Sequence, residues 1–159
     1  MIRTLLATAL VAVAFPAAAQ SVPAANYTDM WWNPTESGWG ISFAQHTGTH
    51  QVFAVWYTYD PRELAGSQHR PLWLVMPGGT WVSPTRLTGT AYVTNGMPFN
   101  QPGSNPVNTP VGTFTFNFND ASHGTFAYNI APPAGLAPGD PAFNLPAMAG
   151  TKSITRQSF

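Results

Sequence analysis

Apolar and polar residues alternate along most of this chain with a period of two. Residues 111–119 show it most clearly, because Phe114, Phe116 and Phe118 fall on one side of an extended chain and Thr113 and Thr115 on the other. This is the pattern of a β-strand with one buried face. The same alternation, interrupted by Gly, Pro and Asn, predicts strands at residues 39–46, 51–59, 71–76, 80–82, 86–94, 111–119, 124–130 and 150–159.

These segments predict an all-β fold, since none of the chain after the first 20 residues repeats with the helical period of about 3.6 residues. We expect a single antiparallel meander of seven or eight strands, closed or nearly closed into a small barrel. Residues 51–59 are apolar on both faces, which suits a central strand or one that lines a barrel. The last segment is expected to pair with the first and to return Ile154 and Phe159 to the core. A two-sheet β-sandwich is the alternative architecture.

Residues 20–159 are expected to form one domain, because no change of composition divides them. Two stretches rich in Pro and Gly, near residues 96–110 and 131–147, are predicted to be long loops. Pro77-Gly78-Gly79 is predicted to be a turn between two short strands.

The first 19 residues have the organisation of a signal peptide. Arg3 precedes an apolar run over residues 5–15, and small residues at Ala17 and Ala19 predict cleavage between Ala19 and Gln20. The run is too short to span a membrane, so we expect a soluble protein in the periplasm or outside the cell.

Charge and cysteine content narrow the possible functions. Beyond Arg3 the chain has five Lys and Arg residues against six Asp and Glu, and it has no Cys. There is no basic patch for nucleic acid, no disulfide framework and no thiolate metal site. No cofactor motif is present, so no cofactor is expected.

Tryptophan is concentrated in the first half of the chain. Residues 31–40 (WWNPTESGWG) hold three of the six tryptophans, and Trp81 is the last one. Clustered aromatic rings offer rigid contact area for a ligand, although the same rings can simply fill a core. The candidate ligand-binding residues are Trp31, Trp32, Glu36, Trp39, Trp56 and Trp73.

Catalytic chemistry has only a weak candidate in Glu36. A carboxyl group beside indole rings can have a raised pKa and act as an acid, with Asp29 or Asp60 as the second carboxylate of a hydrolase. The alternative is a structural Glu36 that accepts backbone N–H bonds in its own turn or pairs with Arg156. The other role expected for Arg156 is stacking on a tryptophan. His46 and His50 flank a turn, but two histidines do not complete a metal site, so none is expected.

Several stretches together resemble a group of exported proteobacterial proteins. These stretches are WWNPTESGWGISFAQH, VFAVWYTYD, RPLWLVMPGG, VGTFTFNFND, GTFAYNI and KSITRQSF. They follow a pattern of WWNPxESGWG, FAxWxxYD, PxW and ITR that spans nearly all of residues 20–159. The resemblance implies export and a single β-domain.

The function predicted first is an exported β-module that binds a small apolar or sugar-like ligand through a Trp-rich site. The main alternative is a structural or interaction module of the cell envelope, with an envelope protein as partner and the aromatic residues packed as its core. A carboxylate-dependent hydrolase using Glu36 is the minor alternative.

Overall fold

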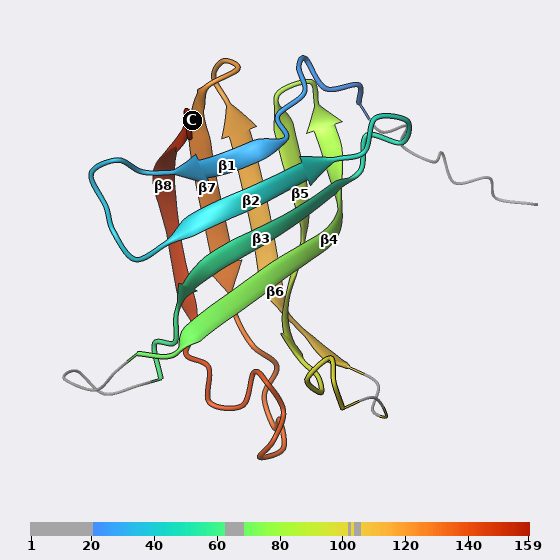
Figure 1. Ribbon diagram of the computed structural model, residues 1–159, viewed down its shortest axis with the longest axis vertical. Helices are drawn as coiled ribbons and strands as arrows, with labels where there is room; N and C mark the ends of the chain where they lie inside the picture. The colour runs from blue at the N-terminus through green and yellow to red at the C-terminus, as the bar shows by residue number, and fades with distance from the viewer. Residues whose placement is uncertain (1–20, 63–68, 102, 104–105) are drawn as a thin grey trace, which may run out of the picture.

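The chain folds into a closed antiparallel β-barrel (Figure 1). The computed structural model describes residues 21–62, 69–101, 103 and 106–159. Its strands are β1 (Asp29–Trp32), β2 (Gly40–Gln45), β3 (Val52–Tyr59), β4 (Pro71–Ser83), β5 (Arg86–Asn95), β6 (Val107–Phe118), β7 (His123–Ile130) and β8 (Met148–Arg156). Each strand pairs with the next, and β8 pairs with β1. The predicted all-β meander is therefore confirmed as a barrel, and the sandwich alternative is wrong. The expected signal peptide and cleavage site lie outside the described residues.

The tryptophan-rich opening stretch contains a strand that the alternation did not reveal. Asp29–Trp32 pairs with β2 through Trp31 and Ile41, and with β8 through Trp31 and Arg156. We expected the barrel to close on residues 39–46, but the closing partner of β8 is this shorter strand. Four residues are too few to show a period of two, which is why the sequence pattern missed it.

Pro77-Gly78-Gly79 is a bulge and not the predicted turn. Phe53 pairs with Pro77 and Val52 with Gly79, so Gly78 is the extra residue and β4 continues to Ser83. Gly78 has a φ of 80°, a conformation that Gly adopts without strain. Proline is tolerated in strands at such bulges, and so its presence did not end the strand.

A second bulge lengthens β6 and shortens the predicted loop at 96–110. Tyr92 pairs with Pro110 and Ala91 with Gly112, which leaves Val111 as the extra residue. The bulge shifts which residues point inward. Before it the odd-numbered Val111 is fully buried, and after it the even-numbered Phe114 is buried. The strand therefore begins at Val107 and not at Val111. Residues 131–147, the other predicted loop, contain no strand.

Aromatic rings fill the interior. Trp31, Trp56 and Trp81 are at most 4% exposed. They pack with inward phenyl rings, as in the contact of Trp56 with Phe126, whose centroids are 5.3 Å apart. The buried rings are Tyr27, Trp31, Phe43, Trp56, Trp81, Phe114, Phe116, Phe118 and Phe126. Burial of each such side chain contributes about 2–3 kcal/mol. Phe159 was expected in this core, but it lies beyond β8 and is 99% exposed.

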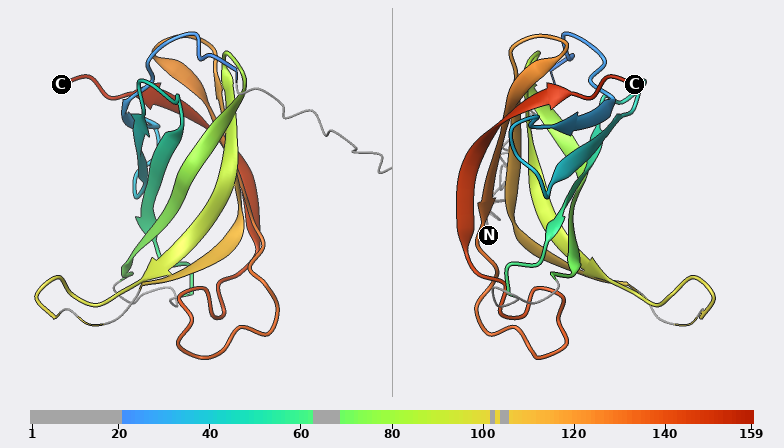
Figure 2. Two further views of the ribbon diagram at one scale, coloured as in Figure 1. Left: turned by 90° about the vertical axis from the view of Figure 1, so that its right-hand side faces the viewer. Right: turned by 60° about the vertical axis from the view of Figure 1, so that its left-hand side comes forward.

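The two ends of the barrel are closed by different segments (Figure 2). At the end where residues 21–28 enter, Tyr27 stacks on Phe118 with 3.9 Å between ring centroids. The opposite end carries the segments that lead from β3 to β4, from β5 to β6 and from β7 to β8. There residues 131–147 fold against the barrel and bury Ala142 and Leu145.

Arg156 joins the last strand to the first. Its guanidinium carbon lies 5.3 Å from the centroid of the Trp31 ring, its Nη2 donates to the carbonyl of Asn26 at 2.8 Å, and its Nε lies 3.6 Å from Asp29 Oδ2. Of the two expected roles for this residue, stacking on a tryptophan is confirmed. Pairing with Glu36 is wrong, because Glu36 bonds to Lys152.

We therefore expect Arg156→Ala to lower the free energy of unfolding by about 1–2 kcal/mol, since it removes a partly desolvated cation–π contact together with a hydrogen bond. Urea denaturation measures the loss. Arg86, an exposed arginine in β5, supplies the control, and Arg86→Ala should change stability by less than about 0.5 kcal/mol. A similarly small change in Arg156→Ala would show that Arg156 does not stabilise the closure.

Candidate functional site

The outer surface of β3 and β4 is apolar. Cross-strand pairs run along it: Phe53 with Pro77, Val55 with Val75, Tyr57 with Trp73, and Tyr59 with Pro71. We call these eight residues the outer aromatic face. Phe53, Tyr59 and Trp73 are 48%, 53% and 59% exposed. On the other wall, β6 presents Thr113, Thr115 and Asn117 between its buried positions, and β8 has Thr151, Ser153 and Thr155 among its partly or fully exposed residues. The barrel exterior thus has one aromatic side and one hydroxyl-rich side.

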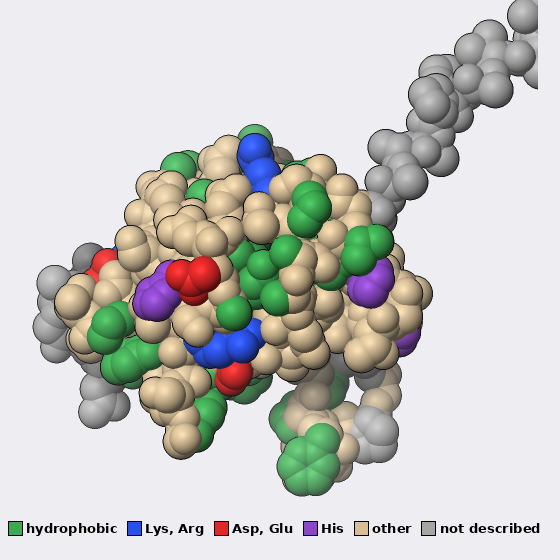
Figure 3. Space-filling view, turned by 90° about the horizontal axis from the view of Figure 1, so that it is seen from above, with side chains coloured by type: hydrophobic (Ala, Val, Ile, Leu, Met, Phe, Trp, Pro, Cys, Tyr) green, Lys and Arg blue, Asp and Glu red, His purple; other side chains and the backbone are tan. Residues whose placement is uncertain are grey.

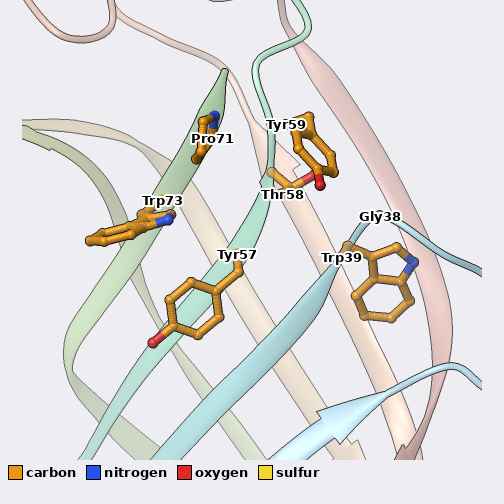
Figure 4. Close-up of a pocket in the computed structure, with 7 residues that line it drawn as sticks. All are labelled: Gly38, Trp39, Tyr57, Thr58, Tyr59, Pro71 and Trp73. Carbon is orange, nitrogen blue, oxygen red and sulfur yellow. The ribbon is translucent and has the colours of Figure 1, made fainter. Parts of the chain in front are cut away.

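One end of this face is hollowed. A depression of about 310 Å³, here called the first hollow, is lined by Gly38, Trp39, Tyr57, Thr58, Tyr59, Pro71 and Trp73. Figure 4 shows Trp39 on one side of it, Tyr57 and Trp73 on the other, and Tyr59 near its end. The Tyr57 and Trp73 rings meet edge to face, 5.8 Å apart at 81°. Four aromatic side chains from three segments of the chain therefore surround one open hollow.

The loop between β1 and β2 holds Trp39 in place. Trp39 Nε1 donates to Glu36 Oε2 at 2.9 Å, and Asn33 Nδ2 donates to Glu36 Oε1 at 3.1 Å. Lys152 forms an ion pair with Glu36, and its ammonium nitrogen lies 5.0 Å from the centroid of the Trp39 ring. Gly38 has a φ of 85° and passes beside the Tyr59 ring. Trp39 is thus oriented by a carboxylate and a cation before any ligand arrives.

The contacts of Glu36 do not give it the raised pKa that the catalytic-acid hypothesis requires. The hydrogen bond from Lys152, with further bonds from Trp39 and Asn33, lowers the pKa of Glu36 below its usual value. A catalytic acid needs the opposite shift. The other two carboxylates of the hydrolase hypothesis each lie beside a separate cation: Asp29 beside Arg156 and Asp60 bound to Arg62. The structural alternative expected Glu36 to accept backbone N–H bonds in its own turn, but the donors are the side chains of Asn33 and Trp39. Its cation is Lys152.

The structure separates the predicted ligand-binding residues into three groups. Trp31 and Trp56 are buried in the core, where a ligand from solvent does not reach them. Trp39 and Trp73 line the first hollow, with Glu36 holding Trp39. Trp32, 38% exposed on β1, lies outside that lining. The expected single tryptophan platform is therefore replaced by a packed core and a surface site.

Sequence reasoning missed Tyr57, Tyr59 and Pro71 as site residues. The signal was present in residues 51–59, whose two faces are both apolar. Such a pattern normally indicates cover on both sides of a strand. In the barrel only one face of β3 is covered, and the other presents Phe53, Tyr57 and Tyr59 outward.

The histidines do not form a metal site in the described part of the chain. His46 Nδ1 accepts backbone N–H groups of Gly48 and Thr49 at 3.1 and 3.0 Å, so it completes its own turn. His123 lies against Asp120 in the turn before β7. No group of three or more His, Cys, Asp or Glu residues that could hold a metal ion occurs among the described residues.

Comparisons with protein-family models, with curated proteins and with solved structures found no significant match for this chain. No helix in the described ranges is long and apolar enough to cross a membrane. The view of the barrel in Figure 3 shows charged side chains that are few and scattered, without a patch of one sign. The outer aromatic face and the first hollow are therefore the features on which a function can be argued.

Proposed function

We propose that this protein is an exported binding module that takes a neutral, sugar-like ring in the first hollow. The observation that carries the proposal is the convergence of Trp39, Tyr57, Tyr59 and Trp73 around one open depression. Rigid aromatic side chains supply contact area at low conformational cost and bring a polar edge with them. Export rests on residues 1–19 and on the resemblance to exported proteobacterial proteins. Mass spectrometry of the protein purified from the periplasm, expected to begin at Gln20, tests it.

The packing of the core favours a surface site over an internal one. Barrels of about eight strands can be filled by their own side chains or can hold one small ligand. Here rings such as Trp56, Phe116 and Phe126 fill the interior. The first hollow lies outside that core and needs no rearrangement to admit a ligand.

The lining of the hollow favours a sugar over a purely apolar molecule. Tyr57, Tyr59 and Thr58 bring hydroxyl groups beside the rings, and no charged side chain is part of the lining. A pyranose ring has apolar C–H faces that stack on aromatic rings and hydroxyl groups at its edge that form hydrogen bonds. Because the hollow is open, a purely apolar ligand would leave much of its own surface in water.

Replacing Trp73 by alanine is expected to weaken binding at least about tenfold, which corresponds to about 1.4 kcal/mol. Trp73 is 59% exposed, so its loss removes a wall of the hollow without opening the core. Tryptophan fluorescence titration with neutral mono- and disaccharides measures the change. Trp32→Ala, which removes an exposed indole outside the hollow, is the matched control and should bind as the wild type does. Equal affinities of Trp73→Ala and the wild type would contradict the proposal.

The exposed outer aromatic face also supports a second candidate, an interaction module of the cell envelope. Contiguous exposed apolar surface marks protein contacts as well as ligand grooves. Pull-down from envelope extract with the wild type and with Trp73→Ala distinguishes this candidate. A partner captured by the wild type and lost in the variant would support it, and equal capture of background proteins by both would count against it.

A further inference from the structure

A second hollow lies where the end of β2, the start of β3 and the bulge of β4 meet. It measures about 370 Å³ and is lined by Ala44, Gln45, His46, Gln51, Val52, Phe53 and Gly78. Phe53, 48% exposed, is its aromatic wall. The exposed side chains of His46 and Gln51 provide polar groups beside that ring. The second hollow therefore repeats the combination of an aromatic ring and polar groups found in the first.

Both hollows border β3. Phe53 and Tyr57 are separated by four residues of the strand, which corresponds to about 13 Å at a rise of about 3.3 Å per residue. On β2, Ser42 lies opposite Val55 and Gly40 opposite Tyr57. These are small residues, so no bulky side chain of β2 blocks the path. A single sugar ring fills one hollow, whereas a chain of several rings reaches both.

The path between the hollows carries no net charge. None of the eight residues of the outer aromatic face is charged, and neither hollow is lined by Asp, Glu, Lys or Arg. Beside Trp39, Glu36 and Lys152 neutralise each other as an ion pair. Neither hollow offers a lining cation to an anionic polymer or a lining carboxylate to a cationic one. The surface therefore suits an uncharged chain.

We propose that the ligand is an extended neutral glycan that runs along the outer aromatic face and places one sugar ring in each hollow. The inference rests on the proposed function, because it extends the binding of one ring in the first hollow to a chain. Tyr57 and Trp73 hold one end of the chain and Phe53 the other. Linked sites of this kind raise affinity because the second ring binds within the same molecule.

Isothermal titration calorimetry with β-1,4-linked N-acetylglucosamine and glucose oligomers, from the monomer to the hexamer, tests this inference. We expect the affinity of the wild type to rise with chain length in at least one series. Phe53→Ala should weaken binding of the hexamer about tenfold and leave the monomer and dimer unchanged, while Trp73→Ala should weaken every length. Phe99→Ala is the matched control, because Phe99 is fully exposed in the segment after β5, outside both hollows.

The possible outcomes separate this inference from the proposed function. If short oligomers bind as tightly as the hexamer, or if Phe53→Ala leaves hexamer binding unchanged, the extended chain is rejected and a single-ring site remains. If no member of either series binds, both proposals are overturned. Light scattering of the unliganded protein adds an independent outcome. A dimer that Phe53→Ala and Trp73→Ala both dissociate would assign the face to a second copy of the chain and reject the glycan.

Discussion

Gly112→Ala is expected to prevent folding or to lower the free energy of unfolding by at least about 4 kcal/mol, a loss seen only for a few specific mechanisms. A Cβ atom at this position would lie 1.9 Å from the carbonyl oxygen of Asn129 and 3.0 Å from the Cα of Ile130. Both are backbone atoms of β7, the strand that pairs with β6 here. They cannot move away without breaking the ladder that closes the barrel.

The backbone of Gly112 adds strain to this clash. Its φ of 148° is one that residues with a side chain rarely adopt. The variant Gly103→Ala separates backbone strain from the clash with β7. Gly103 has nearly the same φ, 145°, but nothing lies within 4 Å of the place that a Cβ atom would occupy there. Circular dichroism and urea denaturation of both alanine variants measure the difference. Equal stabilities of Gly112→Ala and Gly103→Ala would show that strain alone, and not the β6–β7 contact, sets the requirement for glycine.

Asp60→Asn is expected to destabilise the protein by about 3 kcal/mol, at the lower end of the range for breaking a buried ion pair. Asp60 is 6% exposed and accepts hydrogen bonds from Arg62 Nε at 2.8 Å and Nη2 at 2.7 Å. Arg62 Nη1 in turn donates to the carbonyl oxygens of Pro141 and Phe143, both at 2.9 Å. The pair therefore ties the end of β3 to the long loop before β8, next to the first hollow. Loss of the carboxylate charge leaves Arg62, which is 27% exposed, without its counter-ion.

The pH dependence of stability follows from the same contact. The hydrogen bond from Arg62 lowers the pKa of Asp60 below its ordinary value of 3.8. A lowered pKa means that the stabilisation is fully present above the unfolded value and is lost as the pH falls through the folded one. The stability gap between the wild type and Asp60→Asn should therefore be widest near neutral pH and narrow in acid below pH 3.8.

Urea unfolding at neutral pH and in acid measures that gap. Asp120→Asn is the control, because Asp120 is a carboxylate in an exposed turn beside His123. It should cost less stability than Asp60→Asn at neutral pH, since solvent screens its charge. A gap between the wild type and Asp60→Asn that stays constant with pH would show that the Asp60 charge is not what stabilises the loop.

The strand pattern was predictable because each buried face imposes a local period of two. Spacing alone assigns Phe114, Phe116 and Phe118 to one face, and all three are buried. Apart from the short strand β1, the strand errors fell where proline and glycine occur within strands. Pro77 and Pro110 have the pattern of strand ends, yet both belong to strands that continue through bulges. A sequence does not distinguish a bulge from a turn, because both require the same residues.

The candidate site was predictable only in part, for a related reason. The clustering of aromatic residues pointed to Trp39, Trp73 and Glu36, and they do meet at or beside the first hollow. Trp31 and Trp56 were candidates on the same grounds and lie in the core. Composition identifies which rings are present, but it does not state which side of a closed sheet each ring faces.

Alternation, turn residues and the lack of cysteine thus determined from the sequence alone that this is an all-β domain stabilised by aromatic burial. Tertiary structure decided which aromatic residues face solvent, because closure of the barrel and the bulges at Gly78 and Val111 set the inner and outer faces. It also decided the partner of Glu36, since Lys152 is 116 residues away in the chain. Pairs so distant are brought together only when β8 folds back beside the opening strand. No local pattern in the sequence records that contact.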